Sequence, residues 1–222
     1  MFYIFFKRTV DIILSTLAII VLLPLFIPVI FLLKITGDGE VFYFQERIGY
    51  KNSTFRIWKF ATMVKDSPNI GSRDITLRND PRVTKFGVIL RRTKINELPQ
   101  LVNIILGDLS IVGPRPLMKS SFAKYSQKIQ NKIYNVKPGL TGIGSIVFRD
   151  EESIISAVED EDPHEYYKRV IAPHKGDLEI WYQSNRSFIL DIKIIFLTAW
   201  VIIFRQSRLF EKMLKDFPKR SF

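Results

Sequence analysis

Residues 91–101, RRTKINELPQL, contain the residue types that chemistry on a phosphorylated substrate requires. The guanidinium groups of Arg91 and Arg92 present paired N–H donors that match phosphate oxygens, and Glu97 supplies a carboxylate. Asn96 stands beside Glu97, at the position where a second acid would complete an acidic pair. A single arginine is more often a solvated surface charge, so the prediction of a phosphate site rests on the combination.

Two further residues extend this set. Arg115 lies in GDLSIVGPRP (107–116), a predicted loop or short strand that two prolines stiffen. Asp108 in the same segment could share a divalent cation with Glu97, because Mg²⁺ is usually held by one or two carboxylates and substrate phosphates. The sequence has no cysteine, Walker phosphate loop, dinucleotide glycine fingerprint, HExxH or Gly-x-Ser-x-Gly motif. Any chemistry must therefore rest on carboxylates and arginines.

Several elements are expected to surround these residues. VFYFQERI (41–48) and TFRIWKF (54–60) are rich in aromatic and β-branched residues and predict a β-hairpin. Residues 64–83 are polar and predict a long loop. KPGLTG (137–142) predicts a turn. Residues 150–165 contain eight acidic residues and predict a solvated surface, with gating of the substrate region as the alternative.

Helical spacing of apolar residues returns in residues 83–108. Pro99 suits the first turn of a helix that begins near Asn96, because asparagine is an accepted N-cap residue. Such a helix would place Glu97 beside its N-terminus, where backbone N–H groups also attract phosphate.

The net charge of +11 predicts an anionic partner: nucleic acid, a phospholipid surface or a phosphorylated substrate. A nucleic-acid binder would interleave aromatic and basic residues on its surface. The aromatic residues of VFYFQ instead alternate like those of a half-buried strand. We therefore expect no nucleic acid and favour the other two partners.

Residues 12–33 carry no charge and are long enough to cross a bilayer core, which needs about 20 apolar residues. A spanning helix is the ordinary interpretation of such a run. Pro24 and Pro28 lie near its middle and favour a kink. Both flanks are cationic, which suits a re-entrant helix with both ends on the cytoplasmic side. Both interpretations remain open from these features, and both embed residues 1–36 in a membrane.

The apolar run Ile194–Phe204 is too short to span a membrane. With Trp200, Arg205 and Arg208 nearby, it predicts an interfacial helix at about residues 187–205. A buried core helix is an equally good interpretation.

Four segments resemble the bacterial sugar transferase family, the monotopic phosphoglycosyl transferases that begin polysaccharide or glycan assembly. They are FQERIG, KFATM, NDPRVTKFGVILRRTKINELPQLVNIILGDLSIVGPRP and KPGLTG. The resemblance extends from the amino-terminal membrane segment to about Phe204. It implies transfer of a sugar 1-phosphate from a UDP-sugar to polyprenyl (undecaprenyl) phosphate, with Mg²⁺ as cofactor and UMP released. It also implies a re-entrant membrane helix broken at a proline, which matches Pro24.

The resemblance also implies roles for individual residues. Arg91 and Arg115 would bind the diphosphate, Glu97 would bind the metal, and residues 137–142 would line the nucleotide end. With the carboxylates considered above, the predicted metal ligands are Glu97 and Asp108, and the predicted catalytic pair is Asn96 and Glu97. The predicted substrate-binding residues are Lys59, Arg91, Arg92, Arg115, Lys137, Gly139 and Thr141.

Two positions depart from the family pattern. Ala61 replaces an arginine, and Asn96 replaces the aspartate that attacks phosphorus, whereas a carboxamide is not a competent nucleophile. Three hypotheses follow: the lipid phosphate attacks directly, Glu97 becomes the nucleophile, or the protein is a catalytically silent membrane binding or scaffold protein.

The sequence therefore predicts one membrane-associated α/β domain, mostly helical, on the cytoplasmic face of a bacterial inner membrane. Residues 1–36 would form the re-entrant membrane helix. Residues 37–222 would form the catalytic domain, with a small β-hairpin and the carboxy-terminal interfacial helix. The expected partners are a UDP-sugar, polyprenyl phosphate and the phospholipid membrane, with downstream glycosyltransferases as further possible partners.

Overall fold

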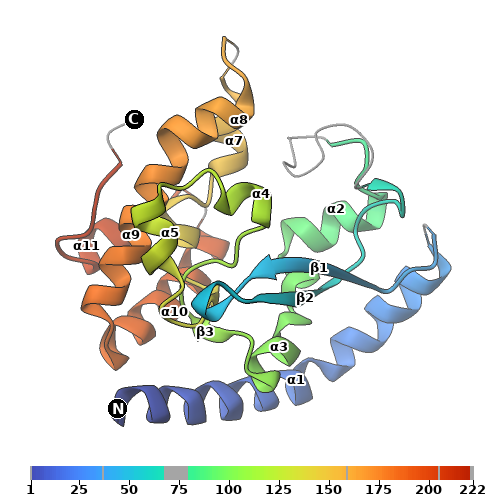
Figure 1. Ribbon diagram of the computed structural model, residues 1–222. Helices are drawn as coiled ribbons and strands as arrows, with labels where there is room; N and C mark the ends of the chain where they lie inside the picture. Colours follow the sequence, from blue (N-terminus) through green and yellow to red (C-terminus); the bar gives the residue numbers. More distant parts are fainter. Residues whose placement is uncertain (1, 37, 68–79, 159, 205, 221–222) are drawn as a thin grey trace.

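Helices make up most of the structure, and two small sheets lie among them (Figure 1). A long amino-terminal helix, α1 (Phe2–Ile35), runs along one side of the molecule, at the bottom of Figure 1. The prediction of a mostly helical α/β fold is confirmed. The computed structural model describes residues 2–36, 38–67, 80–158, 160–204 and 206–220.

The predicted hairpin is confirmed. Strand β1 (Phe42–Ile48) pairs antiparallel with β2 (Thr54–Phe60), and the 3₁₀ turn η1 (Tyr50–Asn52) lies between them. The predicted loop at 64–83 follows, but its residues 68–79 lie outside the described part of the chain.

The exposed edge of β2 is bound by a side chain rather than by a third strand. Asn103 accepts a hydrogen bond from the backbone N–H of Trp58 through Oδ1, at 2.9 Å. Its Nδ2 donates to the carbonyl of Arg56 at 2.8 Å. A buried amide from helix α3 (Gln100–Leu106) thus fixes the hairpin to that helix.

The predicted helical segment divides into three pieces: α2 (Lys85–Arg92), the 3₁₀ turn η3 (Ile95–Glu97) and α3. The prediction of a helix that begins near Asn96 is wrong, because Pro99 occupies the N-cap position and α3 begins after it. The N–H of Leu98 bonds to the carbonyl of Ile95, an i to i−3 bond that winds this segment as a tight turn.

A second sheet joins two short parallel strands, β3 (Ser110–Val112) and β4 (Gly139–Thr141). Of the two forms predicted for residues 107–116, a loop or a short strand, the structure shows a short strand, whereas the turn predicted at 137–142 becomes a strand after Pro138. Two glycines explain this, because Gly113 and Gly139 let the backbones approach closely. The N–H of Gly139 donates to the carbonyl of Pro114 at 2.8 Å, which places β4 directly behind Arg115.

Gly139→Ala is expected to lower the free energy of unfolding by about 3 kcal/mol, through overpacking against backbone atoms. A β-carbon at this position would lie 2.1 Å from the nitrogen of Gly113 and 2.4 Å from the carbonyl oxygen of Thr141. Thermal melting in detergent would measure the loss, with the exposed Ser184→Ala as control. An unchanged melting temperature would contradict the conclusion that the backbones at Gly113 and Gly139 lie too close to admit a side chain.

The carboxy-terminal half is helical and contains the main hydrophobic core, whose members include Ile143, Ile171, Leu178, Ile194 and Leu197. Its helices are α4 (Lys119–Phe122), α5 (Gln127–Ile133), α6 (Ile143–Val147), α7 (Glu151–Ser156), α8 (Pro163–Tyr166), the π-helix η4 (Tyr167–Ile171), α9 (Ala172–Asn185), α10 (Phe188–Ile203) and α11 (Leu209–Met213).

The acidic stretch at 150–165 is solvated only in part. Glu151 accepts a hydrogen bond at 2.5 Å from Lys175, which is buried in the core-facing side of α9. The prediction of a simple solvated surface is therefore wrong for Glu151, because the buried ammonium requires a partner. Glu159 lies outside the described residues.

Helix α1 continues through Pro24 and Pro28 without interruption, so the predicted break at Pro24 is not present. The helix curves along the domain instead (Figure 1). Packing against the domain explains this, because Leu22, Leu25 and Phe26 contact apolar clusters around the proline and support the helix where a hydrogen bond is lost. By length and composition, α1 is sufficient to cross a membrane.

Both ends of α1 contact the same folded domain. Lys7 forms an ion pair with Asp191 in α10, at 2.6 Å. Near the other end, Val29 and Leu33 pack in a cluster with Phe60. The opposite face of α1 exposes large apolar side chains along its length, among them Phe5, Leu17, Val21, Ile27 and Phe31.

The sequence of helix α10 was interpreted as either an interfacial helix or a buried core helix, and the structure shows features of both on opposite faces. Ile194 and Leu197 are fully buried in the main core. Ile189 and Ile203 are 68% and 71% exposed, so the outer face is apolar too. The predicted bounds, about 187–205, agree within two residues, although Arg205 lies outside the described residues.

Candidate active site

Glu97 lies at the centre of a cluster of cationic side chains that come from separate segments. Arg115, three residues after β3, places Nη2 2.9 Å from Oε1 of Glu97. Lys59, in β2, places Nζ 3.7 Å from the same oxygen. The structure thus brings together three of the residues that the sequence predicted for the site.

Charge, rather than exposure to water, keeps Glu97 ionised. Burial raises the pKa of this carboxyl, but the positive charges of Arg115, Lys59 and Lys94 outweigh it and hold the pKa well below its ordinary value. Glu97 in turn raises the pKa of Arg115. Glu97 is therefore a carboxylate at neutral pH, and its charge is shared between two cations.

Lys59 holds its proton weakly. Burial lowers its pKa to about 7, although Glu97 opposes the decrease. The guanidinium groups of Arg47, Arg115 and Arg91 contribute to it, because like charges disfavour protonation. The cluster thus holds more positive charge than one carboxylate neutralises, so a bound polyanion would stabilise it.

Arg47 belongs to this cluster and was not predicted from the sequence. Its side chain donates to the carbonyl of Pro116 at 3.3 Å and to the side chain of Gln45. Burial first, and then the charge of Arg115, lower the pKa of Arg47 to about 10. The hairpin register holds a signal that could have found it: Arg47 and Lys59 lie on the same face, because alternate residues of paired strands share a face.

Arg91 and Arg92 end α2 and have different surroundings. Arg91 is half-buried, and its charge reaches Lys59, whereas Arg92 is exposed. Consecutive helical residues point about 100° apart, so both cannot face the same site. The structure therefore places Arg91, rather than Arg92, beside the cluster.

Asn96 is 7% exposed and lies in the η3 turn directly before Glu97. Its Oδ1 is buried and finds no hydrogen-bond donor among the residues that the structure describes. An unsatisfied buried oxygen costs free energy, so its presence beside a cationic cluster is typical of a site whose partner is a ligand.

Asp108 lies apart from Glu97, because the two residues flank opposite ends of α3, a helix about 10 Å long. Its carboxylate accepts a hydrogen bond from Asn103 at 3.1 Å. Lys137 lies at the same end, where its Nζ and the guanidinium of Arg8 both approach Gly107. The structure therefore does not bring Asp108 and Lys137 to the carboxylate of Glu97.

Gly139 and Thr141 support the site from behind. Gly139 bonds to the carbonyl of Pro114, next to Arg115, as described above. The hydroxyl of Thr141 lies 2.6 Å from that of Thr198 in α10, so this side chain faces the core.

Several half-buried cations thus surround one ionised carboxylate, on a domain with a long exposed apolar helix. The family model described as "Bacterial sugar transferase" matches residues 2–205. The chain belongs to this family.

Curated relatives agree with that assignment. The exopolysaccharide production protein ExoY of Sinorhizobium fredii is 34% identical over 206 residues, which cover 86% of this chain and 83% of ExoY. The UDP-glucose:undecaprenyl-phosphate glucose-1-phosphate transferase of Escherichia coli is 36% identical over 87% of this chain. The undecaprenyl-phosphate galactose phosphotransferase of Salmonella typhimurium is 32% identical over 90%. The chain spans 39% and 41% of the length of these last two relatives.

Proposed function

We propose that this protein transfers a sugar 1-phosphate from a UDP-sugar to undecaprenyl phosphate and releases UMP. The observation that carries the proposal is the convergence of Lys59 and Arg115 on Glu97, with Arg47 and Arg91 near enough to lower the pKa of Lys59. Forked guanidinium groups bind phosphate oxygens in pairs, and a diphosphate supplies the negative charge that this cluster lacks. The names of the relatives support the same pair of substrates.

The apolar surfaces support a membrane position for the site. The outer faces of α1 and α10 are apolar, and water would be a poor environment for so many large exposed side chains. Because both ends of α1 contact one domain, we propose that α1 enters and leaves the bilayer on that side. The cytoplasmic face of the inner membrane would give the site access to both the lipid phosphate and the soluble nucleotide.

Direct attack is the mechanism that the side chains favour. In this route an oxygen of undecaprenyl phosphate forms a bond to the β-phosphorus as the bond from that phosphorus to UMP breaks. Arg115 and Lys59 would hold the diphosphate while charge develops, and positioning and electrostatics supply most of the catalysis of phosphoryl transfer. Glu97 is less suited to be the nucleophile, since its Oε1 carries both ion pairs.

Mg²⁺ fits the site as a cation shared with the substrate. The described residues contain no group of three acidic or histidine ligands, so the protein alone does not form a closed metal site. Glu97 and the unsatisfied Oδ1 of Asn96 would hold the cation together with phosphate oxygens. Bound Mg²⁺ would neutralise charge on the diphosphate. Asp108 would not take part, because α3 separates it from Glu97.

Asn96 also favours a second candidate function, a catalytically silent binding or scaffold protein. Release of UMP by the purified protein in lipid nanodiscs separates the two. The assay contains undecaprenyl phosphate, Mg²⁺ and a panel of UDP-sugars, with Glu97→Gln as the comparison. Lipid-dependent release that Glu97→Gln abolishes is the result expected of a transferase. No release from any donor, with activity gained in Asn96→Asp, would instead establish the silent protein.

The affinity for a UDP-sugar is expected to fall as the pH rises through about 7. Below that pH Lys59 is already charged in the free protein, so binding a diphosphate has no protonation cost. Above it, each pH unit weakens binding by up to about tenfold, until the higher pKa of the bound state is reached. Calorimetry with UDP-glucose between about pH 6 and 8.5 would detect the accompanying proton uptake, away from the phosphate pKa values. Lys59→Met should abolish the pH dependence, and retention of the same slope would exclude Lys59 as its source.

A further inference from the structure

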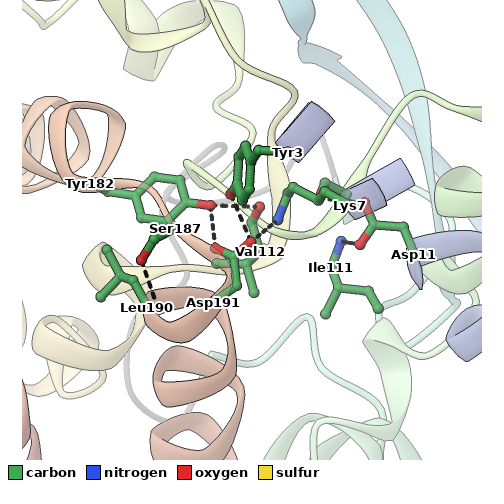
Figure 2. Close-up of polar contacts among 10 residues, drawn as sticks. Tyr3, Lys7, Asp11, Ile111, Val112, Tyr182, Ser187, Leu190 and Asp191 are labelled. Carbon is green, nitrogen blue, oxygen red and sulfur yellow. Dashed lines mark hydrogen bonds and ion pairs between the residues drawn. The ribbon is translucent and has the colours of Figure 1, made fainter. Parts of the chain in front are cut away.

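Polar side chains from α1 bind β3 directly. The carboxylate of Asp11, which is 4% exposed, accepts a hydrogen bond from the hydroxyl of Ser110 at 2.7 Å. It accepts a second one from the backbone N–H of Ile111 at 3.1 Å. Figure 2 shows Asp11 and Ile111 facing each other across this contact. A side chain of the apolar helix thus fixes the first two residues of the strand.

A second buried carboxylate, Asp191 of α10, holds the amino-terminal turns of α1 and the end of the same strand (Figure 2). Its two oxygens accept hydrogen bonds from Lys7 at 2.6 Å, Tyr3 at 2.8 Å and Tyr182 at 2.7 Å. The hydroxyl of Tyr182 also lies 3.3 Å from the carbonyl oxygen of Val112. Each residue of β3 therefore has a polar contact: Ser110 and Ile111 bond to Asp11, and Val112 bonds to Tyr182.

The same turns of α1 also bind the other half of the site. Arg8 donates to the carbonyls of Ile104 and Ile105 at 2.5 and 2.9 Å, in the last turn of α3. The first turn of α3 follows Glu97 closely in the chain. One short segment of α1 is therefore joined both to α3, which follows Glu97 in the chain, and to β3, which precedes Arg115.

Hydrogen bonds of this kind fix the position of α1 more narrowly than its apolar contacts do. Apolar faces tolerate small displacements along a helix, whereas a buried carboxylate that loses its donors is strongly destabilised. Arg115 follows Val112 by three residues, and peptide geometry allows little stretch between them. A displacement of β3 would therefore move the Arg115 guanidinium relative to Glu97.

We propose that Asp11 is a positioning residue of the phosphate site: through β3 it sets the place of Arg115 and so couples docking of α1 to diphosphate binding. Asp191 holds α1 in the register that this contact requires. The inference rests on the proposed function for its ligand, whereas the coupling from Asp11 to Arg115 can be measured without that ligand.

The test compares Asp11→Ala, the milder Ser110→Ala and the control Thr9→Ala in the full chain in lipid nanodiscs. Thr9 lies on the same helix and is exposed, and its hydroxyl donates to the carbonyl of Phe5 within α1. Calorimetry measures the affinity for UDP-glucose, and hydrogen exchange measures protection of the backbone N–H groups of residues 112, 113, 115 and 117, which do not bond to Asp11. Circular dichroism confirms that each variant is folded at the temperature used.

Asp11→Ala is expected to weaken UDP-glucose binding by about 10- to 100-fold, as displacements of catalytic groups commonly do. Ser110→Ala should weaken it less and in the same direction, and both should speed exchange at the N–H groups of residues 112, 113, 115 and 117, while Thr9→Ala does neither. A purely structural role would lower the melting temperature of Asp11→Ala but leave affinity and exchange of the folded protein unchanged, and this result would overturn the proposal.

If the unaltered protein binds no UDP-sugar, the proposed function fails and hydrogen exchange alone decides the coupling. Equal exchange of the N–H groups of residues 112, 113, 115 and 117 in Asp11→Ala and Thr9→Ala would then refute it.

Discussion

Arg115→Ala is expected to slow UMP release by at least about 100-fold, comparable with the removal of one donor from an oxyanion site. The variant loses the guanidinium that lies 2.9 Å from Oε1 of Glu97 and keeps the ammonium group of Lys59, 3.7 Å from the same oxygen. Without Arg115 the pKa of Glu97 must rise, because this arginine is the charge that lowers it most. Initial rates with a saturating UDP-sugar in nanodiscs measure the effect.

Arg115→Lys and Arg56→Ala make this test specific. Lysine restores the charge but not the forked pair of donors, so Arg115→Lys should recover only part of the rate. Arg56 lies in the same hairpin as Lys59 but is exposed, and its removal should leave the rate within about twofold, as for ordinary surface substitutions. Equal losses in Arg56→Ala and Arg115→Ala would mean that general surface charge, rather than this ion pair, binds the substrate.

Asn96→Asp is expected to change the mechanism. The new carboxylate would lie beside the cationic cluster, which favours its ionised form. Its oxygen could then attack the β-phosphorus of the UDP-sugar, forming an acyl phosphate that carries the sugar as UMP leaves. We expect a stoichiometric burst of UMP without lipid acceptor. With acceptor, turnover should be faster by on the order of tenfold, or about 1.4 kcal/mol of barrier.

Intact-protein mass spectrometry checks this prediction. Asn96→Asp should gain the mass of one sugar phosphate, and hydroxylamine should remove it. The unaltered protein and Asn135→Asp, an exposed asparagine, should gain nothing. An adduct on the unaltered protein during turnover would rule out direct attack. Turnover by the unaltered protein, with neither burst nor adduct in Asn96→Asp, would show that position 96 does not reach the phosphorus.

The hairpin, the long apolar helix and the helical segment around Glu97 were predictable because each follows from local periodicity. The strand at Gly139–Thr141 was not, since its partner lies far away in sequence and the signal at 137–142 is that of a turn. The start of α3 was misplaced because local N-cap preference favoured Asn96, whereas the 3₁₀ bonds around Pro99 decide it.

The types of residue in the site were predictable from the sequence, whereas which of these residues lie together was less so. Glu97, Lys59 and Arg115 meet as the motifs suggested, although three separate segments supply them. Asp108 was grouped with Glu97 because both are carboxylates of one motif, but a helix between them separates the two. Arg47 was missed because strand pairing, rather than its own segment, places it on the same face of the hairpin as Lys59.

The contacts of Asn103 with the hairpin have consequences for folding and for resistance to aggregation. Two strands alone are marginally stable in water, so the hairpin should persist only after α3 has docked against it. An unpaired strand edge also invites other chains to add to it, and the two hydrogen bonds to Trp58 and Arg56 occupy part of that edge. Once α3 has docked, Asn103 therefore hinders the addition of a strand from another chain at this part of the β2 edge.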